Sequence, residues 1–355
     1  MKIRANKGSV LIMALWVVAL LSFLSISLGR KATLEISLTK FMVGKVKSKY
    51  YAWAGIMQSL QEIKALVESA RGKSEENPDS GENRLDQKYY QQLPHFQDVC
   101  PEGESCIFAN FHIPELGQDG DALIAMKPEE TKININGLTK QNMTVMIELL
   151  GLLGAEEENA QIISHSLLDW KDVDKVLSHR EYGAEDFYYD SLSDPYNNKQ
   201  TNFDTIYELL LVRGMTQEIF DELKPYVTVY PRQGRLAVNL YFAPEQVLKA
   251  LALSMSGPIT NTDREDAESM VKKVLDHRQS HSDEYQDLNV KIDVADYALN
   301  AKEKVLWLSL QRYRSQSVGY MHVYAWGRDK QQDITTLLET VINGADLSLV
   351  FWKRY

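Results

Sequence analysis

The sequence predicts an α+β fold with a long N-terminal helix and a large helical insertion. An uncharged apolar run from Ser9 to Leu28 continues, without a proline, into an amphipathic stretch that ends near Ala70. Segments typical of β-strands occur at 106–126 and again between about 288 and 355. The residues between them follow a helical period. A helical block flanked by strands indicates an insertion into one α+β domain.

The N-terminal apolar run is long enough to cross a membrane. Its 20 residues, Ser9 to Leu28, span roughly 30 Å as a helix, which matches the hydrocarbon core of a bilayer. A secretory signal has a shorter apolar core followed by a small-x-small cleavage site, which the sequence here lacks. Because Lys2, Arg4 and Lys7 precede the run, we expect the N-terminus in the cytoplasm and the main domain outside.

The stretch that follows the apolar run predicts a continuation of the same helix. Apolar residues recur at three- and four-residue steps from Leu34 to Val67. We therefore expect one helix that leaves the membrane and becomes amphipathic outside it. An anchor followed by a separate helix is the alternative.

Composition limits the partners of the chain. The 355 residues carry a formal net charge of -10, and the pI is near 5.3. A nucleic-acid binder would show a basic face, so this class is disfavoured. The two cysteines, Cys100 and Cys106, flank a short Pro/Gly loop, which favours a disulfide in an oxidising compartment. A zinc site is disfavoured because no second cysteine pair or histidine cluster completes it.

The helical block contains a short internal repeat. Ile135 to Thr139 and Val212 to Thr216 each place a glycine and then a threonine before a helix, where the threonine can cap it. A third helix start, Asn239 to Glu245, places Pro244 in a first helical turn. These units resemble helix-hairpin-helix or SAM-like motifs. Acidic flanks would repel phosphate, so we interpret them as packing units without nucleic acid.

The most charged segment runs from Asp169 to Asp194. It contains eight acidic residues (Asp169, Asp172, Asp174, Glu181, Glu185, Asp186, Asp190 and Asp194) and three cations (Lys171, Lys175 and Arg180). Crowded carboxylates repel one another unless a cation neutralises them. Ca²⁺ prefers oxygen ligands, so this segment predicts a calcium site or, as the alternative, a solvated acidic loop. It is not an EF-hand, because the glycine and the spaced glutamate of that loop are absent.

An enzymatic alternative is a membrane-anchored periplasmic hydrolase that uses paired carboxylates such as Glu185 and Asp186. The sequence contains no serine nucleophile elbow, HExxH motif or Walker loop. His165 and His179 are expected to be ordinary helix or surface residues. The sequence therefore predicts no enzyme.

The N-terminus resembles the type IV pilin and pseudopilin class. A short basic leader ends at Gly8, and an uncharged helical run follows it into a soluble domain. In that class a prepilin peptidase cuts after the glycine, which here implies cleavage between Gly8 and Ser9 and methylation of the new N-terminus. Most members carry glutamate at the fifth mature position, whereas this chain has Met13. A buried carboxylate is useful only where a partner neutralises it, so Met13 suits a subunit with no neighbour ahead.

A more extensive resemblance covers most of the chain. Its order and spacing are similar to those of the K-type minor pseudopilins of type II secretion, the general secretion pathway protein K family, which also lack the fifth-position glutamate. The segments that carry it are DW-x-D-x-D, YGAEDFYY, L-x-DPY, FDTIYELLLVRGMT, PYVTVYP and VN-x-x-x-AP-x-x-VL-x-AL, all between Asp169 and Leu251. VNLYFAP departs from the small-residue form usual before AP.

The resemblance implies a pilin-like fold, in which the long helix packs on an antiparallel sheet that carries an inserted helical domain. It implies a leader at 1–8, a transmembrane helix at 9–28, a pilin-like part at 29–126, the helical domain at 127–286 and C-terminal strands at 287–355. It also implies calcium at Asp172, Asp174, Glu185 and Asp186, with Asp169, Asp194 and Asn197 as second choices.

The family's role implies a protein of the bacterial inner membrane with a periplasmic main domain. The expected partners are the I- and J-type minor pseudopilins, the next pseudopilus subunit below and the prepilin peptidase. The expected function is to initiate or cap a pseudopilus from its tip during protein export.

Overall fold

The computed structural model describes residues 7–70, 92–100, 106–112, 120–281, 292–315 and 319–355. Four helices and strands precede the helical region: α1 (Lys7–Ala70), α3 (Phe96–Val99), β1 (Ile107–His112) and β2 (Gly120–Pro128). That region contains β3 (Ile133–Asn134), α4 (Thr144–Leu152), α5 (Glu157–Lys171), α6 (Asp186–Asp190), α7 (Gln217–Leu223), β4 (Val227–Thr228), α8 (Glu245–Met255), α9 (Arg264–Ser280) and α10 (Ala301–Leu310). The chain ends with β5 (Tyr320–Asp329), β6 (Ile334–Asn343) and β7 (Leu349–Arg354).

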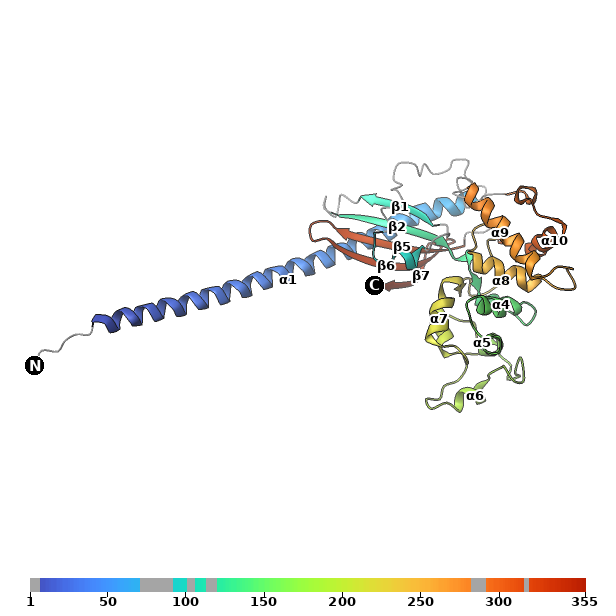
Figure 1. Ribbon diagram of the computed structural model, residues 1–355, viewed down its shortest axis with the longest axis horizontal. Coiled ribbons are helices and arrows are strands. Elements are labelled where there is room, and N and C mark those ends of the chain that lie inside the picture. The colour runs from blue at the N-terminus through green and yellow to red at the C-terminus, as the bar shows by residue number, and fades with distance from the viewer. Residues whose placement is uncertain (1–6, 71–91, 101–105, 113–119, 282–291, 316–318) are drawn as a thin grey trace, which may run out of the picture.

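The N-terminal helix is continuous, as the sequence predicts. Its 64 residues run from the apolar segment into the body of the protein, where its C-terminal half lies against the sheet (Figure 1). From Leu11 to Met42 every side chain of α1 is exposed, whereas Tyr51, Ala52 and Ile56 are buried. By length and hydropathy the helix can span a membrane, and its most apolar window is not buried by the rest of the protein.

The sheet has the order β1-β2-β5-β6-β7, and all its neighbouring strands are antiparallel. The helix α1 packs against β2, β5 and β6. It approaches β5 closely at Gly327, where a Cβ atom would meet the backbone of α1 at Ser48 and Ala52. The Ser48 hydroxyl also hydrogen-bonds to that of Thr336 in β6, at 2.7 Å. The absence of a side chain at Gly327 therefore allows α1 to pack closely on the sheet.

The opposite face of the sheet is covered by α3 and its flanks. Phe96, Val99 and Cys100 pack there on Trp326 and Leu337. The indole N–H of Trp326 donates to the carbonyl of Pro94 at 2.8 Å. Cys100 and Cys106 form a disulfide, which ties this cover to β1. Both faces of the central strands are thus buried.

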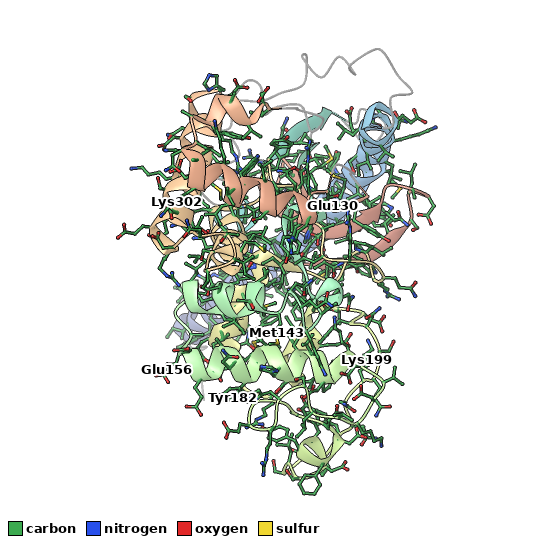
Figure 2. All side chains as sticks on the ribbon, turned by 90° about the vertical axis from the view of Figure 1, so that its right-hand side faces the viewer. Glu130, Met143, Glu156, Tyr182, Lys199 and Lys302 are labelled. Atoms are coloured by element: carbon green, nitrogen blue, oxygen red, sulfur yellow. A yellow bond between two sulfur atoms is a disulfide. The ribbon has the colours of Figure 1, made fainter. Side chains whose placement is uncertain are left out.

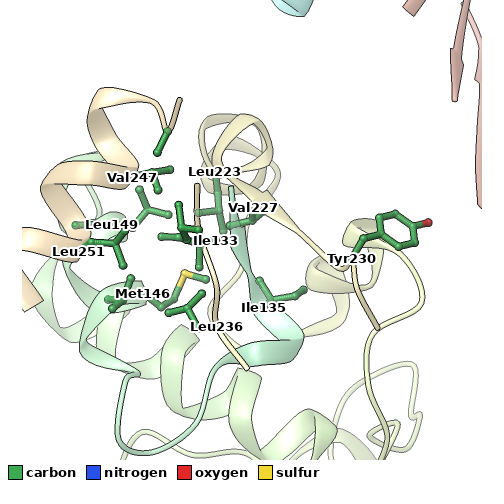
Figure 3. Close-up of a cluster of buried hydrophobic side chains, with 14 of the residues drawn as sticks. Ile133, Ile135, Met146, Leu149, Leu223, Val227, Tyr230, Leu236, Val247 and Leu251 are labelled. Atoms are coloured by element: carbon green, nitrogen blue, oxygen red, sulfur yellow. The ribbon is translucent and has the colours of Figure 1, made fainter. Parts of the chain in front are cut away.

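The helical region has its own apolar core, which is continuous with that of the sheet. Figure 3 shows side chains from β3, α4, β4 and α8 converging there, including Ile133, Leu149, Val227 and Leu251, all fully or almost fully buried. The short strands β3 and β4 pair in parallel at its centre. The helices α8, α9 and α10 pack on one another and on this core.

The strand predictions between 292 and 314 are wrong. Residues Val294–Tyr297, in the first expected strand, form a short 3-10 helix. Residues 304–314 were expected to be extended, but they belong to α10 and the turn that follows it. Asn300 and Glu303 form a capping box that begins the helix, and the buried residues Glu303, Leu306 and Leu310 follow helical spacing. Alternation within a Leu-rich segment was therefore misleading. The helical layer continues past residue 286, where the sequence placed the end of the inserted domain.

The internal repeat is only partly realised. Thr216 caps α7 by accepting from the amide of Ile219, and Gly214 before it has a left-handed φ of 86°. Thr139, in contrast, does not cap a helix, because a turn separates it from α4, which begins at Thr144. Pro244 lies at the N-cap of α8, one residue before its first turn.

A buried polar network joins the helical region to the sheet. His322 of β5 lies between two carboxylates, with Nδ1 at 2.7 Å from Glu129 and Nε2 at 2.8 Å from Glu339 of β6. Lys132 donates to the same Glu129 oxygen at 2.7 Å. Although burial opposes ionisation, His322 lowers the pKa of Glu339 to about 2. Burial raises the pKa of the adjacent Glu130 to about 7.

The close approach at Gly327 gives a direct test of the helix–sheet packing. Gly327→Ala should destabilise the soluble part, residues 30–355, by about 1–3 kcal/mol, because the added methyl overlaps the α1 backbone. Gly151→Ala is the matched control: Gly151 is exposed in α4 with open space around it, and alanine favours a helix by about 1 kcal/mol. Urea unfolding measures both variants. Equal stability of the two would contradict the described packing.

Candidate metal centre

The acidic segment lies at the end of the helical region that is farthest from the sheet. The helix α5 ends there, a loop follows, and α6 forms the extremity of this region (Figure 1). Figure 2 shows α5 running from Glu156 toward Lys199, with Tyr182 beneath it. The segment is therefore remote from the apolar part of α1.

Asp169 is the most enclosed carboxylate of the segment. It lies in the last turn of α5 and is fully buried. Its Oδ1 accepts from the amide of Ser178 at 2.7 Å, and its Oδ2 from the amide of Ala184 at 2.8 Å. A Cβ atom on Gly183 would overlap Oδ2, so glycine is needed for the loop to close over it. The loop is thus folded around this carboxylate.

Two further carboxylates lie beside Asp169. Asp172 is the C-cap of α5, and Glu185 is the N-cap of α6 and is buried. One oxygen from each of Asp169, Asp172 and Glu185 lies within 4.8 Å of the others. The C-terminal end of a helix carries a partial negative charge, which makes anions at the end of α5 more unfavourable still. A bound cation would relieve this repulsion.

The cations of the segment do not neutralise this cluster. Lys171 turns away and donates to the carbonyls of Ile135, Asn136 and Leu138. Lys175 pairs with Asp186 at 3.0 Å, and Arg180 is exposed. Within the described residues, no ion pair reaches Asp169, Asp172 or Glu185. The cluster retains its excess of negative charge.

The electrostatics of the cluster fit a hard divalent cation. Burial first, and neighbouring carboxylates second, raise the pKa of Asp172 to about 6 and that of Glu185 to about 7. Burial also raises the pKa of Asp169, against the hydrogen bonds that it accepts. Oδ1 of Asp172 and Oε1 of Glu185 are buried and have no hydrogen-bond partner. Carboxylate oxygens without partners, close to one another, are the ligands that Ca²⁺ prefers.

The other predicted ligands lie in different surroundings. Asp174 is exposed and accepts from the amide of Val176, and Asp194 and Asn197 are exposed too. Asp186 binds Lys175 through Oδ2, while its Oδ1 is buried without a partner. The structure therefore brings together two of the four main predicted ligands, Asp172 and Glu185. Asp169, predicted as a second choice, lies beside them. Whether any of them binds metal stays a prediction.

Sequence reasoning missed Asn198, which organises the cluster. Its side-chain amide donates to the carbonyl of Asp169 at 3.1 Å and to Oε2 of Glu185 at 2.8 Å. The prediction named its neighbour Asn197 instead. The two asparagines differ in burial: Asn198 is buried, whereas Asn197 is exposed. Two consecutive asparagines in a loop carry no signal that would identify the inward one.

A group of aromatic side chains packs around Trp170, the residue next to Asp169. The Trp170 ring packs edge-on against Tyr189, with centroids 5.2 Å apart, and stacks on Phe203 at 6.4 Å. Tyr196 completes this group. Trp170, the residue after Asp169, is thus fixed, which helps to hold the Asp169 carboxylate in the site.

The residues considered for catalysis are engaged in structural contacts. Glu185 faces Asn198 and the other cluster carboxylates, whereas Asp186 faces Lys175, so the two carboxylates have different partners. His165 lies 3.1 Å from the Ser178 hydroxyl, and its ring is 4.9 Å from that of His179. His179 stacks on Tyr182. These contacts indicate that the side chains of Glu185, Asp186, His165 and His179 help to pack the loop.

Residues 131–232 match a family model described as type II secretion system protein K. The type II secretion system protein K of Aeromonas hydrophila is 36% identical over 106 residues, which are 30% of this chain and 31% of that protein. The putative type II secretion system protein K of Escherichia coli (strain K12) is 32% identical over 119 residues, 34% of this chain and 36% of that protein. The matched stretch thus spans about a third of each relative.

A solved structure resembles almost the whole chain. The match is to a chain in the crystal structure of the GspK–GspI–GspJ complex from enterotoxigenic Escherichia coli, with a TM-score of 0.58 and 16% identity. It covers 89% of this chain and 99% of that chain. At this identity the likeness concerns the fold, and it confirms the predicted α+β class with a long helix, an antiparallel sheet and a helical insertion.

Proposed function

We propose that the chain belongs to the type II secretion system protein K family and is a minor pseudopilin at the tip of a periplasmic pseudopilus. There it initiates or caps assembly for protein export. The observation that carries the proposal is the family's domain, residues 131–232, inserted into a sheet that packs on one long apolar helix. The proposed partners are the I- and J-type minor pseudopilins, the next subunit below and the prepilin peptidase.

Two features support a place at the tip. The apolar segment of α1 carries Met13, which is 67% exposed, at the position where most pseudopilins carry a glutamate that pairs with the N-terminal amine of the subunit ahead. A carboxylate in lipid without a partner is unfavourable, so its absence suits a subunit with nothing ahead of it. The helical region also lies beyond the end of the sheet, away from the free part of α1 (Figure 1). This bulk would obstruct a further subunit.

The partner proposal is tested by reconstitution. Residues 30–355 should co-elute with the soluble parts of the I- and J-type pseudopilins as one ternary complex in size-exclusion chromatography. The soluble part of the major pseudopilin is the control, and it should not replace either partner. Separate elution of the three proteins at micromolar concentration would contradict the tip role.

We also propose that the leader is removed after Gly8 while the helix is retained in the inner membrane. The basic residues before the apolar run support a cytoplasmic N-terminus and a periplasmic main domain. Intact mass spectrometry of the membrane form should find Ser9 as the first residue, with the added mass of a methyl group. An intact Met1 in cells with an active prepilin peptidase would overturn this proposal.

The acidic cluster is proposed to hold Ca²⁺. Asp169, Asp172 and Glu185 would supply carboxylate oxygens, and Asp174, Asp186, Asp194 and Asn197 remain candidates for the rest of the coordination. The ion would neutralise the three carboxylates and the end of α5 together. Its role would be structural, because the same carboxylates already bind Asn198 and the loop amides, so the ion would complete the contacts that close the loop.

Chelation tests the calcium proposal. EDTA should lower the melting temperature of residues 30–355 by several degrees, and excess calcium should restore it, since a ligand at 100 times its Kd stabilises by about 2.7 kcal/mol. Asp172→Asn with Glu185→Gln should abolish this response. Glu181→Gln with Asp190→Asn removes the same charge from exposed positions of the segment and should retain it. An EDTA-insensitive melt of the unmodified protein would rule out the site.

A further inference from the structure

Four large apolar side chains project into solvent beside the acidic cluster. The exposed fractions are 79% for Val173, 66% for Val176, 40% for Leu177 and 89% for Phe187. They lie in the loop after α5 and in α6, at the extremity of the helical region (Figure 1). A solvent-exposed phenylalanine grouped with three aliphatic residues is a feature of binding surfaces.

The apolar residues are carried by the segments that form the acidic cluster. Val173 directly follows Asp172, and Phe187 lies two residues after Glu185. The salt bridge from Lys175 to Asp186, 3.0 Å long, holds the two segments side by side. Leu177 lies against Gly183, where an added Cβ atom would be 3.3 Å from its Cδ2. Repulsion among the carboxylates would separate these segments, whereas a bound cation keeps them together.

Charges around the four residues restrict what can cover them. Asp174, Glu181, Asp190 and Asp194 are exposed, against one exposed arginine, Arg180, while Lys175 is already paired, so acidic charge predominates. An anionic membrane surface would be repelled by this rim, and so would a second copy of the same surface. The complementary surface is an apolar centre with lysine or arginine around it.

We propose that Val173, Val176, Leu177 and Phe187 form a metal-ordered docking surface for a partner protein whose apolar patch has a basic rim. The proposal rests on the calcium site for its ordering and adds a binding role to the pseudopilus tip. Phe187 is the anchor, because it is the largest and most exposed of the four. Burying such a side chain in a complex typically contributes about 1.5–3 kcal/mol, so its loss should weaken binding at least about tenfold.

Site-specific photocrosslinking tests the surface in the full chain, expressed in its own host. A photoreactive phenylalanine analogue replaces Phe187, and a second variant carries it at Ile259, which is fully exposed in another loop. Position 187 should crosslink to a protein other than the I- and J-type partners, at a peptide adjacent to lysine or arginine. The crosslink should fall at least tenfold with EDTA, with 1 M salt or with Asp172→Asn and Glu185→Gln. Position 259 should not yield it.

The alternative occupants are outcomes of the same experiment. Crosslinks at position 187 to lipid, to a second copy or to an I- or J-type partner would overturn the proposal, and so would the absence of any crosslink. A crosslink that persists in EDTA would overturn the metal-ordered part.

A secretion assay supplies a second readout. Val176→Asp with Phe187→Asp should lower the amount of exported protein in the medium several-fold, while Ile259→Asp should leave it unchanged. The double variant must still join the I- and J-type partners and retain its calcium-dependent melt, since both residues point away from the core. Normal secretion by such a variant would overturn the docking role. Failure of the tip proposal would show instead as lost assembly in the unmodified protein.

Discussion

The structure depends on the buried contact of His322 with Glu129 and Glu339. Glu129 follows β2, His322 lies in β5 and Glu339 in β6, so one imidazole joins two strands of the sheet to the segment that enters the helical region. Pro128 and Met321 are register partners on neighbouring antiparallel strands. The helical region therefore leaves and re-enters the sheet at adjacent points, like a very long hairpin loop. Removing His322 would leave Glu129 with Lys132 and Glu339 with the Tyr355 hydroxyl, so each of two buried carboxylates would lose one of its partners.

This attachment separates the two ends of the molecule. The helical region extends from one end of the β2–β5 pair, and the apolar part of α1 extends from the other (Figure 1). Contacts between neighbouring subunits through the helix are thus compatible with an exposed surface at α6. Because insertion into a hairpin only lengthens a loop whose ends are already fixed, its entropic cost grows slowly with length.

Periodicity predicted α1, the helical block and most of the strands because their apolar spacing is long and regular. The same reasoning failed at 304–314, where Leu306 and Leu310 follow a helical step that the neighbouring apolar residues obscure. The junction could not be predicted, since His322 meets a glutamate 193 residues away. The acidic excess indicated a cation site, but only the end of α5 and the burial of Asn198 decide which carboxylates face one another.

Metal binding would affect the extremity of the helical region more than its core. Lys171 lies between Asp169 and Asp172, and its ammonium group is held by three carbonyls of the segment from Ile135 to Leu138. Trp170 is likewise fixed by Tyr189 and Phe203. These contacts keep α5 in place without help from an ion. Ala184 and Tyr189 are buried in the same apolar core, so these parts of the loop and of α6 are anchored as well. The stretch from Val173 to Leu177 is exposed, so loss of the cation would release this stretch first while the helical core stays folded.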